Sequence, residues 1–375
     1  MRFPGFEGEW EEKKLGEICK FVRGPFGSAL KKEFFIDDGY AVYEQSHAIH
    51  NNFHSFRYYI SEEKFNSLRR FSVEPKDIIM SCSGTMGKFA IIPKKSKKGI
   101  INQALLKLTP QENFYHKFIK LALELPQIQN KILSQSAGGA IKNVVGIPQL
   151  KEIELYIPKP IEQNKISTFF SLLDQRIETQ SKIIEELKLL KSTLSKRLLL
   201  NGAWEQFQIA DIASIGRGRV ISSVEISKQR NPEYPVYSSQ TSNNGIMGYL
   251  DSYDFEGKYV TWTTDGANAG TVFYRNGKFN CTNVCGTLKI NQNHNPYFVA
   301  LCLNLIAKKY VSTNLANPKL MNNVMASVKL SLPTLQEQNR VAKLFVILTN
   351  KIHCENSILE ALHKEKNYFL QQMFI

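Results

Sequence analysis

Residue types that could carry out chemistry occur in this sequence, but their spacing fits no complete catalytic motif. The segment Gly84-Thr85-Met86-Gly87-Lys88 resembles a phosphate-binding loop, yet the full motif requires glycine at position 82 and serine or threonine at position 89. These positions hold Cys82 and Phe89. The segment Asn295-Pro296-Tyr297-Phe298 lacks the second proline that adenine methyltransferases contain in their catalytic motif. The sequence therefore predicts no phosphate-transfer or methyl-transfer centre in this chain.

Histidine and cysteine, which commonly bind metals, are not spaced as metal ligands either. Among the seven histidines only His50 and His54 are four residues apart, and no suitably placed glutamate completes a site. The six cysteines form no C-x-x-C pair, and no histidine lies at zinc-finger distance from Cys281 and Cys285. We therefore expect buried free thiols, no metal, no nucleophile–base set and a non-catalytic chain.

The charge of the chain favours a polyanionic partner. The 375 residues include 48 Lys and Arg against 34 Asp and Glu, a net charge of +14. Residues 1–157 contain 23 basic and 17 acidic residues, and residues 202–332 contain 12 and 8. This excess suits nucleic acid, although an ordinary basic surface is the alternative. The sequence contains neither a signal peptide nor an apolar run of about 18 residues, so we expect a cytoplasmic protein without membrane contact.

The chain contains an internal duplication. Residues 158–200 recur at residues 333–375 with an offset of 175, no gap and eleven identities, including Glu-Gln-Asn at 162–164 and 337–339. Chance at ordinary composition would give about two or three identities. The segments before each copy repeat more faintly, and Trp10 corresponds to Trp204 at an offset of 194. The chain therefore alternates globular and helical segments twice.

Each duplicated segment has the apolar spacing of a coiled-coil helix. No proline or glycine lies between residues 162 and 200, and apolar residues recur after four and three positions. The predicted seam residues are Ile166, Phe170, Leu173, Ile177, Ile184, Leu187, Leu194 and Leu198 in the first copy and Val341, Phe345, Leu348, Ile352, Leu359, Leu362, Phe369 and Met373 in the second. Each helix would be about 58 Å long. Because neither is stable alone, we expect each to pack on the other.

Four seam positions are polar and leave two interpretations open. They are Gln180 and Glu355, and Lys191 and Lys366, which correspond at the offset of 175. The lysines either extend their side chains from the seam edge into solvent or disfavour alternative registers of the two helices. We predict an α+β fold in which residues 1–157 and 202–332 form mixed α/β domains and residues 158–201 and 333–375 form helices. The first helix is expected to end at Leu200-Asn201-Gly202.

The globular segments contain polar and basic loop residues of the kind that contact phosphates and base edges. Each of them taken alone could equally be an ordinary solvated side chain. The candidates in the first segment are Lys31, Lys32, Arg57, Arg69, Arg70, Ser83, Thr85, Lys88, Lys95 and Lys97. The candidates in the second segment are Arg217, Arg219, Arg230, Ser239, Gln240, Asn243, Asn244, Thr264, Asn268 and Lys319.

Over its whole length the chain resembles the specificity subunit of bacterial type I restriction–modification systems. The resemblance rests on the opening Gly8-Glu9-Trp10-Glu11 with Leu15-Gly16-Glu17-Ile18, and on the starts of the two helices. These starts read Ile157-Pro158 followed by Glu162-Gln163, and Pro333 followed by Glu337-Gln338. Trp204 and the stretch from Gly245 to Leu250 also resemble the second recognition domain of that family.

The resemblance implies a non-catalytic subunit that recognises double-stranded DNA. Two target-recognition domains would each read one half of a split, asymmetric target, and the antiparallel helices would set the spacing around a pseudo-two-fold axis. The helices would dock two modification subunits, which transfer methyl to adenine, and restriction subunits, which cleave DNA. S-adenosylmethionine, ATP and Mg²⁺ would then bind to the partners and no cofactor to this chain. The expected docking positions are Glu162, Gln163, Phe170, Glu337, Gln338 and Phe345.

Three other functions remain open from the sequence. A specificity subunit of a combined restriction–methylation enzyme, which cuts beside its site, would differ from the first interpretation only in its partner. A self-sufficient methyltransferase or nuclease would need the cofactor loop that is missing. The third is a scaffold whose coiled coil joins protein partners without reading DNA.

Overall fold

The computed structural model of the chain describes residues 2–134, 146–200, 203–312 and 317–374. The chain divides into two compact units. The first unit comprises Met1–Thr179 and Leu359–Ile375, and the second comprises Gln180–Ile358. Each unit therefore contains a globular part and portions of both long helices. Asn201 and Gly202, where the sequence places the end of the first helix, lie outside the described residues, as does Ile375.

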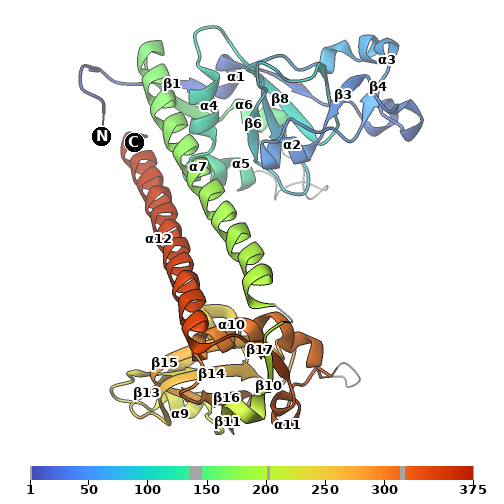
Figure 1. Ribbon diagram of the computed structural model, residues 1–375. Coiled ribbons are helices and arrows are strands. Elements are labelled where there is room, and N and C mark those ends of the chain that lie inside the picture. Colours follow the sequence, from blue (N-terminus) through green and yellow to red (C-terminus); the bar gives the residue numbers. More distant parts are fainter. Residues whose placement is uncertain (1, 135–145, 201–202, 313–316, 375) are drawn as a thin grey trace. The chain divides into compact units, whose positions relative to one another are not determined.

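The first unit combines three small sheets with short helices (Figure 1). Its strands are β1 (Glu11–Lys14), β2 (Cys19–Arg23), β3 (Tyr40–Tyr43), β4 (Tyr59–Ile60), β5 (Ile78–Ser81), β6 (Phe89–Ile91), β7 (Gly99–Ile101), β8 (Leu105–Pro110) and β9 (Glu154–Ile157). Its short helices are α1 (Leu15–Ile18), α2 (Gln45–His50), α3 (Glu62–Ser67), α4 (His116–Leu123), α5 (Pro126–Ser134) and α6 (Ile147–Lys151). The sheets have the orders β2-β8-β5-β6, β4-β3-β7 and β1-β9, and only β3 and β7 pair in parallel among the described strands of this unit.

The second unit repeats this plan with longer strands. Its strands are β10 (Glu205–Gln208), β11 (Ala213–Arg217), β12 (Tyr234–Tyr237), β13 (Ile246–Leu250), β14 (Phe255–Thr263), β15 (Val272–Cys281), β16 (Cys285–Ile290) and β17 (Lys329–Leu332). Its short helices are α8 (Ile209–Ile212), α9 (Ser223–Ser227), α10 (Pro296–Ile306) and α11 (Asn322–Ala326). One sheet has the order β11-β16-β14-β15-β12-β13, in which β12 and β15 are parallel, and β10 pairs with β17. Helix α10 packs on β14 and β15 (Figure 1).

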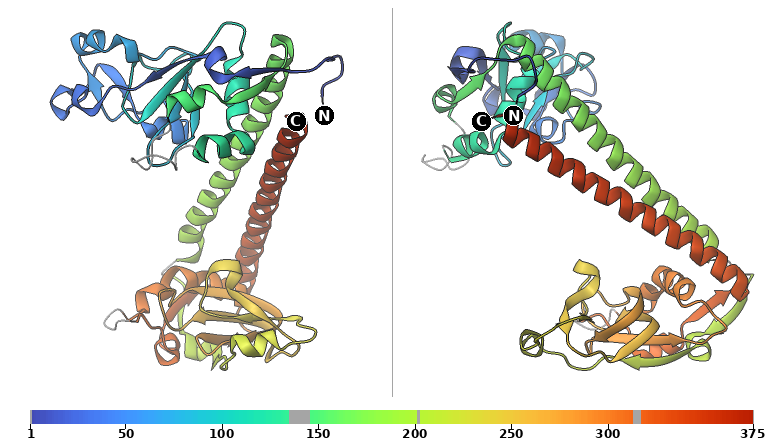
Figure 2. Two further views of the ribbon diagram at one scale, coloured as in Figure 1. Left: turned by 180° about the vertical axis from the view of Figure 1, so that it is seen from behind. Right: turned by 90° about the vertical axis from the view of Figure 1, so that its left-hand side faces the viewer.

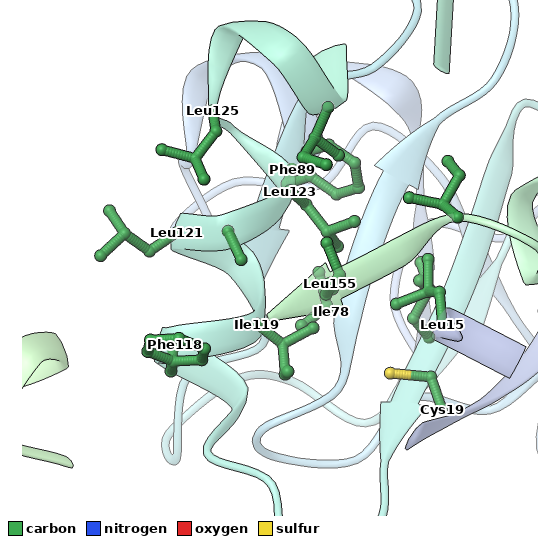
Figure 3. Close-up of a cluster of buried hydrophobic side chains, with 14 of the residues drawn as sticks. Leu15, Cys19, Ile78, Phe89, Phe118, Ile119, Leu121, Leu123, Leu125 and Leu155 are labelled. Atoms are coloured by element: carbon green, nitrogen blue, oxygen red, sulfur yellow. The ribbon is translucent and has the colours of Figure 1, made fainter. Parts of the chain in front are cut away.

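The core of the first unit forms where α4 covers the strands. Ile119 and Leu123 on one face of α4 meet Ile78 of β5 and Leu155 of β9, and all four side chains are buried (Figure 3). Each such side chain contributes about 1.5–3 kcal/mol by leaving water. Helix α10 provides the corresponding face in the second unit, with Phe298 fully buried.

The two tryptophans that recur at the offset of 194 belong to this frame. The Trp10 ring lies edge-on to Phe118 and Phe374, with ring centroids 5.9 Å and 5.7 Å away. The Trp204 ring tilts against Phe298 at 6.2 Å. Both therefore contact the helix that covers the sheet of their own unit.

The two long helices are α7 (Pro160–Leu199) and α12 (Leu335–Met373). Within each unit they run antiparallel, as the two views in Figure 2 show for the start of α7 and the end of α12. In the first unit Phe169 packs edge-on against Phe369 at 5.1 Å. Every predicted seam residue is buried or half-buried, which confirms the sequence periodicity. The α+β fold with two mixed domains and two long helices is likewise confirmed.

The polar seam residues bind the opposite helix. In the first unit Lys366 Nζ donates to Asp174 Oδ1 at 2.5 Å. In the second unit Lys191 Nζ donates to Thr349 Oγ1 at 2.8 Å, and burial lowers the pKa of this lysine. The two contacts are equivalent, because both their donors and their acceptors differ by 175 positions. Both lysines therefore bind the opposite helix at the edge of the seam, which supports the interpretation that they disfavour alternative registers.

The remaining polar pair lies where the duplication meets itself. Gln180 Nε2 donates to Glu355 Oε2 at 2.5 Å and to the Glu355 carbonyl at 3.0 Å, and both side chains are buried. Since Gln180 and Glu355 are equivalent positions of the two copies, this contact joins the same position of each copy.

Candidate nucleic-acid interface

An arginine–glycine pair ends the equivalent strand in each unit. Arg23 is the last residue of β2 and is followed by Gly24. Arg217 is the last residue of β11 and is followed by Gly218, so the two pairs correspond at the offset of 194. The Gly24 N–H donates to the Leu105 carbonyl and the Gly218 N–H to the Cys285 carbonyl, both at 3.0 Å.

The backbone approach at these two positions admits only glycine. A Cβ atom at Gly24 would lie 1.8 Å from the Asn102 carbonyl oxygen, and one at Gly218 would lie 2.2 Å from that of Cys281. No side chain fits at such distances, so both strands must turn here in the same way.

A glycine-containing hairpin loop stands beside each of these pairs. In the first unit the Gly87 N–H donates to the Ser81 carbonyl at 3.0 Å, and in the second the Gly270 N–H donates to the Thr263 carbonyl at 2.9 Å. The loops join β5 to β6 and β14 to β15, and the second is one residue longer. The segment that resembles a phosphate-binding loop is therefore a hairpin between strands, whereas such a loop would lead into a helix.

A third segment completes the arrangement where β3 and β12 end. The Tyr43 carbonyl accepts the Asn102 N–H, and the Tyr237 carbonyl accepts the Thr282 N–H, both at 2.9 Å. We call the whole set the recognition corner. It comprises residues 23–24, 43–45, 82–88 and 102–104 in the first unit and residues 217–218, 237–239, 264–271 and 282–284 in the second.

The side chains that tie the corner together differ between the units. In the first unit Gln45 Nε2 donates to the Thr85 carbonyl at 3.2 Å, and Ser83 Oγ donates to Gln45 Oε1 at 3.4 Å. In the second unit Asn268 Nδ2 instead donates to the Ser239 carbonyl at 3.0 Å. The backbone frame is thus duplicated while its polar side chains are not.

The corner contains several predicted contacts and brings others near it. Ser83, Thr85, Lys88, Arg217, Ser239, Thr264 and Asn268 lie within it. Arg57 lines an adjoining cleft of about 470 Å³ together with Gln45 and Asn102. Lys319 joins the second corner through backbone pairing with Asp265. Gln240, Asn243 and Asn244 continue the chain beyond Ser239, where Asn243 and Asn244 adopt left-handed backbone angles.

Other predicted contacts lie away from the corner. Lys31, Lys32, Arg69, Arg70 and Arg230 are exposed on short turns, and Lys95 and Lys97 lie between β6 and β7. Lys97 pairs with Asp38 at 2.6 Å. Arg219 binds Glu225 at 2.7 Å and Asp254 at 3.0 Å, so its charge is already balanced.

The prediction that Thr264 contacts DNA directly is wrong. Its side chain is fully buried, and its hydroxyl oxygen accepts Arg217 Nη2 at 3.3 Å. It therefore supports Arg217 from beneath. The sequence reasoning missed Arg23, Gln45, Asn102 and Gln103, although the match of Arg23-Gly24 to Arg217-Gly218 at the tryptophan offset was a usable signal.

The positions predicted to dock partners are largely built into the frame. Glu162, Gln163, Phe170, Gln338 and Phe345 are buried, and only Glu337 keeps substantial exposure. Gln163 accepts the Tyr115 N–H at 2.9 Å and donates to the Pro158 carbonyl at 2.8 Å. Gln338 makes the same two bonds with Asn295 and Pro333, at 2.8 Å and 2.9 Å. Each glutamine thus fastens its long helix to the helix that covers the sheet.

Equivalent apolar side chains are instead exposed on both long helices. Leu172 and Ile347 are 60% and 56% exposed, and Ile183 and Ile358 are 36% and 39% exposed. Each pair is related by the offset of 175. Exposed apolar residues therefore occur at equivalent positions of the two helices.

The cysteines are free thiols, and most of them are buried. All six cysteines are free; five are buried, but Cys354 is exposed, contrary to the expectation of buried thiols. Burial raises the pKa of Cys19 and Cys302 to about 12 and that of Cys82 to about 11. In the described part of the chain, no three His, Cys, Asp or Glu residues are grouped to hold a metal ion, and no helix has the length and apolarity to cross a membrane.

Comparisons with known proteins agree on one family. The model of the type I restriction modification DNA specificity domain matches residues 7–189 and again residues 201–364. The specificity subunit of the type I restriction enzyme MpnII from Mycoplasma pneumoniae is 45% identical over 144 residues, which cover 38% of this chain and 43% of that protein. A protein of the same organism named as type I specificity subunit S.MpnORF365P is 39% identical over 218 residues, 54% of this chain and 79% of the relative.

The fold is also found in a solved structure. The crystal structure of a type I restriction–modification S subunit from M. genitalium superposes with a TM-score of 0.67 at 18% identity, covering 100% of this chain and 99% of the other.

Proposed function

Because this chain belongs to the family of type I restriction–modification DNA specificity proteins, we propose that each unit reads one half of a split DNA target through its recognition corner. The observation that supports this most directly is a duplicated backbone frame with unlike polar side chains. Gln45 and Ser83 in the first corner correspond to Ser239 and Asp265 in the second. Amide, hydroxyl and carboxylate groups form different hydrogen bonds with base edges, so the two half-sites are expected to differ.

The long helices set the distance between the two half-sites in this proposal. An α-helix of 40 residues is about 60 Å long and much stiffer than a loop of the same length. The polar seam contacts support a single register, because a shift of either helix would separate Lys366 from Asp174 and Lys191 from Thr349. The unread gap of the target would therefore have a fixed length.

We further propose that the exposed apolar surfaces of the helices dock two modification subunits. Leu172 and Ile347 are exposed at equivalent positions of the two helices, as are Ile183 and Ile358, which suits two copies of one partner. These partners would bring S-adenosylmethionine and transfer its methyl group to adenine. Restriction subunits, with ATP and Mg²⁺, would add cleavage. This chain would contribute recognition and spacing only.

The half-site assignment is tested by changing one corner. In Ser239→Ala with Asn268→Ala, the second corner loses polar groups and the link between its two segments. We expect methylated sites in which one half is altered or relaxed while the other half and the gap stay the same. Sequencing of methylated adenines in cells that contain this chain and its modification subunit measures the outcome. Changes in both halves would contradict the assignment of one half to each unit.

The docking surfaces are tested by Leu172→Glu and Ile347→Glu. Each single variant should bind one modification subunit where the wild type binds two, and the double variant should bind none, as measured by native mass spectrometry. The control is Leu189→Glu on α7. Leu189 is also exposed, but the equivalent position of α12 holds Lys364 and not an apolar residue. Full stoichiometry in the double variant would place the docking surface elsewhere.

A further inference from the structure

We propose that Arg23 and Arg217 bind DNA phosphates at equivalent places in the two half-sites and so set the register in which each corner meets its bases. This inference rests on the proposed function of the corners. It assigns one contact, identical in both units, that does not depend on the sequence being read.

The two arginines are held in the same way. Arg23 Nε donates to the Gln103 carbonyl at 3.1 Å, and Arg217 Nε donates to the Asn283 carbonyl at 2.5 Å. The two acceptors are equivalent, since each belongs to the turn that leads into the strand paired with the arginine's own strand. Both guanidinium groups are thus fixed by their Nε edge, which leaves the Nη atoms directed away from that bond.

Neither arginine is neutralised. Within the described residues, no carboxylate pairs with Arg23 or Arg217, whereas Arg219, two positions further along, is bound by two carboxylates. The only other described partner of either guanidinium is the Thr264 hydroxyl, which is uncharged. Arg23 and Arg217 therefore each present a fixed guanidinium group that no described carboxylate neutralises.

A phosphate is the ligand that this geometry favours. A fixed guanidinium offers two parallel N–H groups, which match two phosphate oxygens. The neighbouring side chains differ between the units, so a group that is retained in both is suited to the part of DNA that is the same in both half-sites. Phosphate contacts position a protein on the duplex, and base contacts specify the sequence. Gln45 and Ser83, or Ser239 and Asn268, would then read bases next to a constant anchor.

The test measures DNA binding by the full chain in complex with its modification subunit. The probes are a duplex that contains the methylated motif and a random-sequence duplex of equal length, each titrated over a range of salt concentrations. Arg23→Ala and Arg217→Ala are compared with Lys20→Ala on β2 and Lys329→Ala on β17, which each remove one exposed positive charge outside the corners. Thermal melting checks that all variants fold.

A phosphate contact has a defined signature in these titrations. Each arginine variant should bind both probes about tenfold more weakly, and the slope of log affinity against log salt should fall by about 0.9 for each contact removed. The methylated motif should not change. Arg23→Lys and Arg217→Lys keep the charge and should keep the slope while losing affinity, because lysine lacks the two-pronged geometry; they replace the alanine variants if those fail to fold.

Two results would overturn the inference without affecting the proposed function. If the alanine variants of Arg23 and Arg217 had the same salt slopes as Lys20→Ala and Lys329→Ala, the arginines would have a structural role only. If the methylated motif were relaxed at one base pair, they would contact bases. If the wild-type complex showed no preference for the motif duplex over the random one, the proposed function itself would fail.

Discussion

The two buried glutamines make a prediction that separates frame residues from surface residues. Gln338 is fully buried at the start of α12, where it accepts the Asn295 N–H and donates to the Pro333 carbonyl. Its amide also lies 3.2 Å from His294 Nδ1. In Gln338→Leu the side chain keeps a similar size but loses every hydrogen bond. The Asn295 N–H and the Pro333 carbonyl, both half-buried, then lose this partner.

The expected cost follows from those two backbone groups. A buried donor or acceptor left unpaired costs about 1–3 kcal/mol, so this half-buried pair, at the lower end of that range, costs about 2–4 kcal/mol. Burial of the leucine side chain offsets about 1–2 kcal/mol of this. The midpoints of these ranges leave a net loss of about 1–2 kcal/mol, which corresponds to a fall in melting temperature of about 2–8 °C for a unit of this size.

Calorimetry of the full chain measures the melting temperature, and hydrogen exchange reports the Asn295 amide directly. The matched control is Gln336→Leu, two positions earlier on the same helix, whose exposed side chain should change stability by less than about 0.5 kcal/mol. Gln163→Leu should reproduce the effect in the first unit. Equal melting of Gln338→Leu and Gln336→Leu, with an unchanged Asn295 amide, would refute the role of the glutamines as fasteners.

Three further predictions concern the core and the seam. A Cβ atom at Gly286 would lie 2.2 Å from the Trp262 ring. Gly286→Ala should therefore lower the free energy of unfolding by about 1–3 kcal/mol, as measured by denaturant unfolding monitored by tryptophan emission. Unchanged stability would mean that the ring moves freely. The hydrogen bond from Lys351, followed by that from Gln180, lowers the pKa of Glu355. The ionised carboxylate therefore contributes stability above the usual glutamate pKa, and this contribution is lost as the pH falls through the lowered pKa. In Glu355→Gln, melting curves should depend less on acid pH. Seven residues inserted after Gln180 shift all later seam residues of α7 against α12. The complex with the modification subunit should then fail to assemble, as measured by gel filtration. An unchanged complex with unchanged target spacing would contradict the pairing of the two helices.

The sequence predicted best what depends on local periodicity. Apolar residues repeat every three and four positions in the helices, and burial follows that repeat along both copies, from Ile166 to Leu198 and from Val341 to Met373. The duplication could be recognised because the helical copies differ by one constant offset. These two features together were sufficient to predict the order of the domains and the pairing of the two helices.

The recognition corner could not be derived in the same way. It joins four segments of each unit, and Arg23 reaches a carbonyl 80 residues away. The offset between the units changes from 194 at Arg23 to 180 at Gln103, so no single alignment of the two halves shows the equivalence. Side-chain type was also ambiguous, because Thr264 and Gln163 are polar but lie in the interior, where their hydrogen bonds hold the frame.

The most direct test of the central claim is the pattern of DNA methylation that this chain specifies. The chain is expressed with its modification subunit in a host without adenine methylation, and methylated adenines are mapped by single-molecule sequencing. Recognition of one half-site by each unit should give one split motif with two unlike halves separated by a gap of fixed length. A continuous motif, a variable gap, or no methylation by a complex that assembles and folds would contradict it.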